Sequence, residues 1–482
     1  MNLAEYAGYD ALGLAELVAR KEVSPKELAQ TAVAARDKVD GALKAVVELY
    51  PDRIEGLDER SLGNGPFRGV PLLIKDVFGH EKGRKIEFGS RLCAGMTVEA
   101  GTYFLDMLKA AGVNILGRSA APEYSMASTT ESAMFGNTSN PWKHGYSAGG
   151  STGGGQAAVL AGIVPIAHGS DIGGSIRIPA SFCGGVGLKP SRMRVSLGPV
   201  VDEGGWGYAM NFVQTKTVRD AAAMLDCVSI PQPGDPFIIP KPDEPYATLA
   251  AKAPPRLKVG IVLDELVGVP VDPEVARAVE AAGTALAGMG HSVERAKVDM
   301  GGDDVLRATF DIFFFGFDSR LDGYARRSGR KPGPDTLEPV ILSVYQAAKE
   351  IDPTRFIAAC GAANTARRKL GAFWTEYDIW LSPTTSRVSE PWGRFNLSRP
   401  GVGVHNMIEE LFKVPCQYTI PHNVMGTPAV SLPLAMHSSG LPIGVQVAAE
   451  PAADHLVLQV AAALEAAMPW RARVPPLHVS KV

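Results

Sequence analysis

The sequence lacks the features that mark several large classes of protein. Its 482 residues contain only five cysteines, scattered and without close pairs, which argues against a disulfide framework or a metal site and for a reducing compartment. The net charge of −3 shows no basic excess, so nucleic-acid binding is not expected. The longest apolar stretch, near residues 157–167, is too short and too rich in glycine and proline to span a membrane.

The amino terminus also lacks a recognisable targeting signal. Residues 1–23 are acidic and amphipathic, without the basic start and apolar segment of a signal peptide. The hydrophobic content of 46% and charged content of 21% are those of a globular protein with a large core. We therefore expect a cytoplasmic protein that binds neither membranes nor nucleic acid.

Predicted strands and helices alternate along the chain. Apolar runs at 69–78, 113–119 and 164–171 predict strands, and residues 100–112 and 153–162 predict helices between them. More strands are predicted at 257–265, 379–385, 429–435 and 441–449. This alternation favours an α/β fold: a single large domain over 1–482 with a mixed, mainly parallel central sheet covered by helices on both faces. Residues 300–415 have the least regular pattern.

Two serines embedded in glycine stand out within residues 147–191. Ser151 and Ser175 lie 24 positions apart. Glycine allows close approach of a substrate, and it lets backbone N–H groups point into a pocket. Lys75 ends the predicted strand at 69–78, and a buried lysine is one of the few side chains that can deprotonate a serine near neutral pH. The combination indicates a Ser-Ser-Lys hydrolytic site.

The second glycine turn is a candidate oxyanion hole. The backbone N–H groups of Ile172, Gly173, Gly174 and Ser175 are placed to converge on a developing oxyanion. Two plainer interpretations stay open from these residues alone. The turn could serve only to connect a strand to a short helix, and a lone lysine at a strand end is usually a surface charge.

The segment around Ser151 also satisfies the G-x-S-x-G pattern of α/β-hydrolases, but the context does not fit that fold. A nucleophile elbow follows a strand, whereas residues 141–150 resemble a loop, and the downstream histidines are isolated. A phosphate-binding loop is excluded because no Lys-Ser or Lys-Thr pair closes the glycine run.

Taken together, these segments resemble the amidase signature family. In that family the nucleophile lies 24 residues after the first serine of GGS[ST]GG, and the catalytic lysine lies in a GVPxxxKD context, as at residues 69–76 here. The motif PxNxxGxPAxSLP appears at 421–433 and GLPIGxQ at 440–446. The resemblance covers nearly the whole chain and implies the amidase signature fold, with a core at 65–230 that carries the catalytic residues.

The resemblance implies a role for each of the three residues. Ser175 would be the nucleophile, Ser151 the proton shuttle that follows a cis peptide bond, and Lys75 the base, with no metal and no cofactor. Asp171 and Arg177 match family positions that we interpret as polar bracing of the glycine turn.

The resemblance is strongest to the 6-aminohexanoate-cyclic-dimer hydrolase-like amidases. It predicts an amidase for a small, apolar or aryl amide, with Met126 and Ile178 as substrate-binding residues and 300–415 as the pocket region. Met126 as plain core remains an alternative, as does a buried helix face for the aromatic run 310–317. A carbamate (urethane) or ester hydrolase would use the same triad. An amidotransferase A subunit is disfavoured because that subunit typically has glutamine where Ile178 stands. The expected partner is the small-molecule substrate, and a homodimer, as among relatives, stays open.

Overall fold

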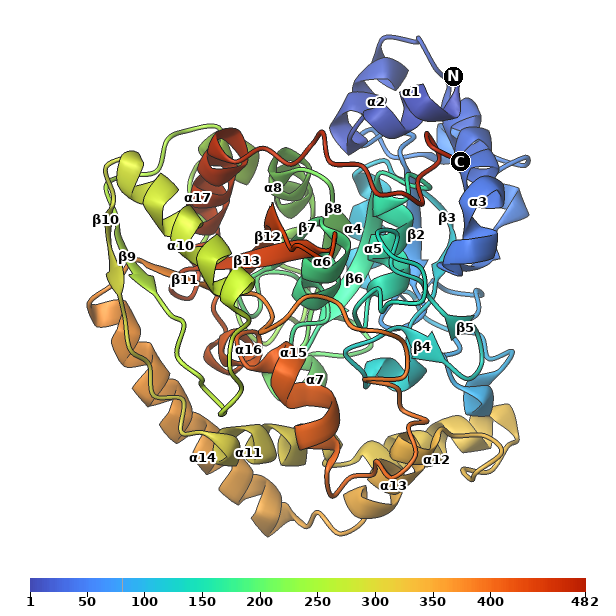
Figure 1. Ribbon diagram of the computed structural model, residues 1–482. Coiled ribbons are helices and arrows are strands. Elements are labelled where there is room, and N and C mark those ends of the chain that lie inside the picture. The colour runs from blue at the N-terminus through green and yellow to red at the C-terminus, as the bar shows by residue number, and fades with distance from the viewer. Residues whose placement is uncertain (80) are drawn as a thin grey trace.

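A computed structural model describes residues 1–79 and 81–482 (Figure 1). Eleven strands form one sheet: β1 (Val46–Leu49), β2 (Pro71–Lys75), β3 (Asn114–Ser119), β6 (Ile166–Asp171), β7 (Val186–Lys189), β8 (Met210–Thr215), β9 (Lys258–Ile261), β10 (Ser292–Arg295), β11 (Ile379–Pro383), β12 (Ala429–Met436) and β13 (Pro442–Ala448). Their order across the sheet is β1-β3-β2-β6-β8-β7-β12-β13-β11-β9-β10. Two short strands, β4 (Glu131–Ser132) and β5 (Gly136–Asn137), pair separately.

Seventeen α-helices accompany these strands in the described part of the chain: α1 (Leu3–Gly8), α2 (Ala11–Ala19), α3 (Pro25–Leu43), α4 (Tyr103–Ala110), α5 (Gly153–Leu160), α6 (Arg177–Cys183), α7 (Gly204–Gly207), α8 (Val218–Val228), α9 (Tyr246–Ala250), α10 (Pro273–Gly288), α11 (Asp303–Phe314), α12 (Phe317–Ser328), α13 (Pro339–Ala348), α14 (Pro353–Gly371), α15 (Lys413–Cys416), α16 (Ile420–Met425) and α17 (Asp454–Ala467). None of the helices in residues 1–79 and 81–482 combines the length and the apolar character needed to cross a bilayer.

The sheet is mixed, and its parallel pairs form two blocks. β3, β2 and β6 are parallel neighbours on one side, and β11, β9 and β10 on the other. Between the blocks the strands pair antiparallel. The single α/β domain with a mixed sheet is confirmed, but parallel pairing is less extensive than expected. The reason is local: β12 and β13 form a hairpin, and β8, which the sequence analysis missed, inserts antiparallel between β6 and β7.

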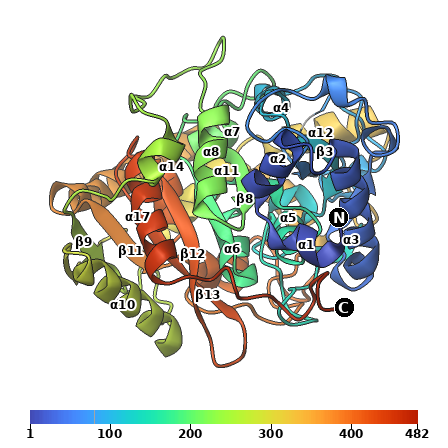
Figure 2. The same ribbon diagram turned by 90° about the horizontal axis from the view of Figure 1, so that it is seen from above.

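Helices cover both faces of the sheet, as expected. α5 and α6 contact each other and the middle strands, and α8 and α17 contact each other near β12 and β7 (Figure 2). Strand β13 separates α6 from α17. Gly444 faces α6, whereas Val445 belongs to the apolar cluster that includes Val457 of α17, because successive side chains of a strand point to opposite faces.

Local sequence signals place the helix ends. Ser24 caps α3 and accepts a hydrogen bond from the Glu27 N–H at 3.1 Å, while the Glu27 carboxylate accepts one from the Ser24 N–H. Pro25 occupies the first turn, where no intrahelical N–H donor is needed. A serine followed three residues later by a glutamate favours such a reciprocal cap.

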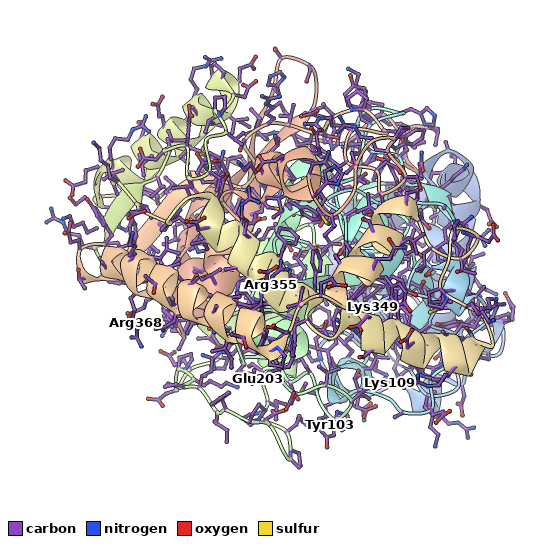
Figure 3. The ribbon with its side chains drawn as sticks, turned by 90° about the horizontal axis from the view of Figure 1, so that it is seen from below. Tyr103, Lys109, Glu203, Lys349, Arg355 and Arg368 are labelled. Carbon is purple, nitrogen blue, oxygen red and sulfur yellow. The ribbon has the colours of Figure 1, made fainter. Side chains whose placement is uncertain are left out.

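Residues 384–406 contain no helix or strand, but residues 300–371 are largely helical, which corrects the sequence-based expectation for 300–415. They contain the helices α11 to α14, which form an arc along one side of the molecule in Figure 1. Seen from below (Figure 3), Arg355 and Arg368 lie on α14. The glycines and prolines that made the pattern look irregular are helix boundaries: Gly316 adopts φ 73° between α11 and α12, and Pro339 and Pro353 begin α13 and α14.

Close packing of α6 on the sheet yields a testable prediction. A Cβ at Gly444 would lie 2.5 Å from Cβ of Ser181 on α6, so Gly444→Ala overpacks this contact. We expect a loss of about 1–3 kcal/mol in the free energy of unfolding, measured by denaturant titration. Gly288→Ala is the matched control, because no atom lies within 4 Å of its added Cβ. Equal stability of both variants would contradict tight packing of α6.

Candidate active site

The site begins where two parallel strands end. β2 and β6 are parallel neighbours, with Leu73 opposite Ala167, so their carboxyl ends meet at one edge of the sheet. Lys75 ends β2, and Ser170 lies near the end of β6. The Lys75 Nζ donates to Ser170 Oγ at 2.9 Å. Ser170 was not predicted, because sequence alone does not give the register of two strands separated by ninety residues; its only signal is its place beside Asp171.

Lys75 is fully buried and lies next to the first glycine-embedded serine. Its Nζ donates to Ser151 Oγ at 2.7 Å, and both side chains are 0% exposed. Burial disfavours the charged ammonium and lowers the pKa of Lys75 to about 7, although the negative charge of Asp171 partly offsets this effect. A substantial fraction of Lys75 is therefore neutral at neutral pH, and a neutral amine can accept a proton.

The loop before α5 presents Ser151 to Lys75. The Gly150–Ser151 peptide bond is cis, as the family resemblance implies. Gly150 is required by packing, since an added Cβ would lie 2.4 Å from the carbonyl oxygen of Thr129. The next residue, Thr152, donates its N–H to the Ser175 carbonyl oxygen at 3.2 Å. This bond holds the two serine-bearing loops side by side.

The second glycine turn is braced by Asp171. Its carboxylate accepts hydrogen bonds from the N–H groups of Gly174 at 2.8 Å and Ile176 at 3.2 Å. Arg177 forms a two-pronged ion pair with the same carboxylate, through Nε at 3.0 Å and Nη2 at 2.9 Å. Burial opposes ionisation of Asp171, yet the charge and hydrogen bonds of Arg177 hold its pKa far below the usual range. The interpretation of Asp171 and Arg177 as polar bracing fits these contacts.

This bracing corrects one part of the predicted oxyanion hole. The Gly174 N–H is already committed to Asp171, so it is not free to bind an oxyanion. The N–H groups of Ile172, Gly173 and Ser175 have no acceptor in the described part of the chain, and all three residues line the cavity. The sequence could not show which of these four donors is free, because that depends on the direction of the Asp171 side chain in the folded protein.

Residues from the carboxy-terminal motifs hold Arg177 in place. The Arg177 Nη1 donates to Gln446 Oε1 and to the Thr419 carbonyl oxygen, both at 2.9 Å, and Nη2 donates to Asn423 Oδ1 at 2.6 Å. Asn423 also donates to Asp171 at 2.9 Å. Asn423 lies in the motif at 421–433 and Gln446 in that at 440–446, so both motifs act by supporting the glycine turn. The sequence analysis gave them no such role.

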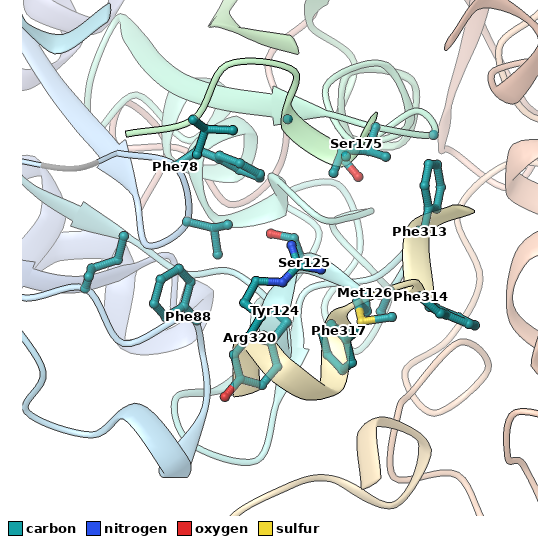
Figure 4. A pocket seen from close by; sticks show the side chains of 18 of the residues that line it. Phe78, Phe88, Tyr124, Ser125, Met126, Ser175, Phe313, Phe314, Phe317 and Arg320 are labelled. Atoms are coloured by element: carbon teal, nitrogen blue, oxygen red, sulfur yellow. The ribbon is translucent and has the colours of Figure 1, made fainter. Parts of the chain in front are cut away.

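The cavity in front of Ser175 has a volume of about 400 Å³ (Figure 4). Met126 and Ile178, which the family resemblance implies as substrate-binding residues, both line it. The aromatic run 310–317 contributes Phe313 and Phe317 to the wall. Ser151 and Lys75 are buried and are not part of this wall, so a group in the cavity contacts Ser175 rather than these two side chains. The remaining wall is mostly apolar and aromatic.

Comparisons with known proteins identify a family and several relatives of the chain. The chain matches the family described as amidase over residues 27–458. It is 36% identical to 6-aminohexanoate-cyclic-dimer hydrolase from Pseudomonas sp. (strain NK87), covering 97% of this chain and 96% of that protein. Among solved structures, a 6-aminohexanoate cyclic dimer hydrolase aligns with a TM-score of 0.93 at 36% identity over 98% of this chain and 99% of the other. A bacterial aryl acylamidase aligns with a TM-score of 0.86 at 25% identity over 96% of both chains.

The buried lysine generates a prediction about pH. Below its pKa, Lys75 is protonated and cannot accept a proton, so kcat/KM should rise with pH and level off above about 7. Lys75→Ala should abolish this rise and lower kcat/KM by roughly 10²–10⁴. The measurement is kcat/KM between pH 5 and 9. Exposed Lys349→Ala is the control and should keep the wild-type profile. A Lys75→Ala enzyme with an unchanged profile would contradict the assignment of Lys75 as base.

Proposed function

The chain belongs to the amidase signature family, and we propose that it hydrolyses small apolar or aryl amides through an acyl-enzyme formed on Ser175. The observation that carries the proposal is the buried contact between Lys75 Nζ and Ser151 Oγ, together with the Thr152 N–H hydrogen bond that joins the Ser151 loop to Ser175 in the cavity wall. A buried base that contacts one serine, next to a second serine exposed to an apolar cavity, is suited to acyl transfer.

The proposed acylation step transfers a proton from the nucleophile to the base through the intermediate serine. Neutral Lys75 accepts the proton of Ser151, which accepts the proton of Ser175 as its Oγ attacks the substrate carbonyl carbon. The carbonyl oxygen becomes an oxyanion and accepts hydrogen bonds from the free N–H groups of Ile172, Gly173 and Ser175. The amine then leaves with a proton returned through Ser151.

Deacylation repeats the proton path with water in place of Ser175. A water molecule attacks the ester carbonyl of the acyl-enzyme and gives its proton through Ser151 to Lys75. Collapse of the second tetrahedral intermediate breaks the bond to Ser175 Oγ, which takes its proton back. The acid leaves, and Lys75 is neutral again. No step calls for a metal or a cofactor.

The composition of the cavity supports the substrate class. Met126 and Ile178 lie near the turn that carries Ser175, and Phe313 and Phe317 extend the apolar wall. Apolar and aromatic walls stabilise a substrate mainly by removing its apolar surface from water. The 6-aminohexanoate cyclic dimer hydrolase and the aryl acylamidase to which the chain is similar are named for amides of aliphatic and aryl type.

The test is release of 4-nitroaniline from a hexanoyl anilide, beside hydrolysis of the carbamate with the same leaving group. Wild type should turn over the anilide, and Ser175→Ala should lower kcat by roughly 10⁴ or more while its circular dichroism stays unchanged. Buried Ser181→Ala, six residues along on α6 and outside the cavity, is the matched control and should retain activity.

The carbamate result decides between two hydrolytic functions. Faster turnover of the carbamate than of the anilide would replace an amide preference with a urethane preference. Turnover of neither substrate by folded enzyme would contradict the proposal and favour an amidotransferase subunit that needs partners. Substantial activity of Ser175→Ala would reject Ser175 as the nucleophile.

A further inference from the structure

One face of helix α12 forms part of the cavity wall. Phe317, Arg320, Tyr324 and Arg327 follow one another at intervals of three or four residues, which places them on a single face of a helix, and all four line the cavity. The surrounding wall is largely apolar. The two guanidinium groups are therefore the main positive charges that a bound substrate would meet.

The two arginines differ in how they are held. The Arg327 Nη2 donates to the Thr97 carbonyl oxygen at 2.9 Å, so this side chain is anchored to the protein. The Arg320 guanidinium has no ion pair and donates no hydrogen bond within residues 1–79 and 81–482; its Cζ lies 5.5 Å from the centroid of the Phe317 ring. Figure 4 shows the Arg320 side chain directed from α12 into the cavity.

An unpaired arginine on a protein surface is ordinary, and Arg326 on the same helix is such a case. Arg320 is exposed as well, but it differs from Arg326 because it lines the cavity beside the Phe317 ring, where its guanidinium can reach a bound substrate. Glu99 is the one acidic residue of this wall, against the two arginines. The cavity therefore has an excess of positive charge with one set of guanidinium donors unused.

We propose that Arg320 binds a carboxylate carried by the substrate at the end opposite the scissile amide. The preferred substrates would then be amides of apolar dicarboxylic acids, or comparable acyl chains that end in an acid. The planar guanidinium matches a carboxylate with two parallel hydrogen bonds. This inference rests on the proposed function, since it assigns a second binding contact to the substrate that Ser175 would attack.

The experiment compares matched anilides that differ only in the distal group. The 4-nitroanilide of hexanoic acid is the neutral probe, and the mono-4-nitroanilides of the unbranched C4 to C8 dicarboxylic acids are the charged probes. The series varies the spacing between the scissile amide and the distal carboxylate, so that the length matching the separation of Ser175 and Arg320 can be found by experiment. We expect one length to exceed the neutral probe in kcat/KM by about tenfold or more, with the difference mainly in KM and weaker at high salt.

The variants test the contribution of the Arg320 side chain separately from that of other residues on the same helix. Arg320→Gln should lower kcat/KM for the favoured charged probe about tenfold and leave the neutral probe within about twofold. Arg320→Lys should recover part of the preference because it restores the charge. Exposed Arg326→Gln, which does not line the cavity, is the matched control and should leave the ratio between the probes unchanged.

The outcomes separate this inference from the proposed function. If no dicarboxylic anilide exceeds the neutral one, or if Arg320→Gln leaves the ratio unchanged, the carboxylate subsite is wrong while the amidase proposal stands. If wild type hydrolyses neither type of anilide, the proposed function itself fails. A loss for both probes in Arg320→Gln would assign Arg320 a general structural role and would overturn the subsite.

Discussion

The buried ion pair between Asp171 and Arg177 is the interaction on which the site depends. Both side chains are 0% exposed, and an unpaired charge at this depth would be strongly destabilising. The pair is supported on every side: Asp171 also binds the N–H of Gly174, while Arg177 binds Asn423 and Gln446. It ties the glycine turn to helix α16 and strand β13, which lie more than two hundred residues later in the chain.

Burial of Lys75 provides the second requirement, which is reactivity. The same low-dielectric environment that makes the Asp171–Arg177 pair obligatory lowers the pKa of Lys75 to about 7. Parallel pairing of β2 and β6 places this lysine beside Ser170, and the loop before α5 places Ser151 against it. The fold thus keeps the proposed base away from solvent and in contact with the hydroxyl group of Ser151.

The sequence predicted the α/β class and the strand that carries Lys75, since these follow from local periodicity and motif context. It missed β8 between β6 and β7 and the helical character of 300–371. Both errors concern residues whose pattern is decided by distant neighbours. A strand buried on both faces has no alternating pattern, and glycine or proline at a helix boundary resembles a loop until the packing is known.

The sequence by itself determined the identities at the site: a lysine at a strand end, two glycine-embedded serines 24 residues apart, and the small residues that permit tight turns. Only the tertiary structure decided which donors are free and which charges are exposed to a substrate. In the folded protein the Gly174 N–H donates to Asp171, and Lys75 donates to Ser170. Arg320 lies in the cavity wall without an ion pair within the described residues. The physical reason is that hydrogen bonds and burial depend on strand register and side-chain direction, which are fixed by contacts between residues far apart in the chain.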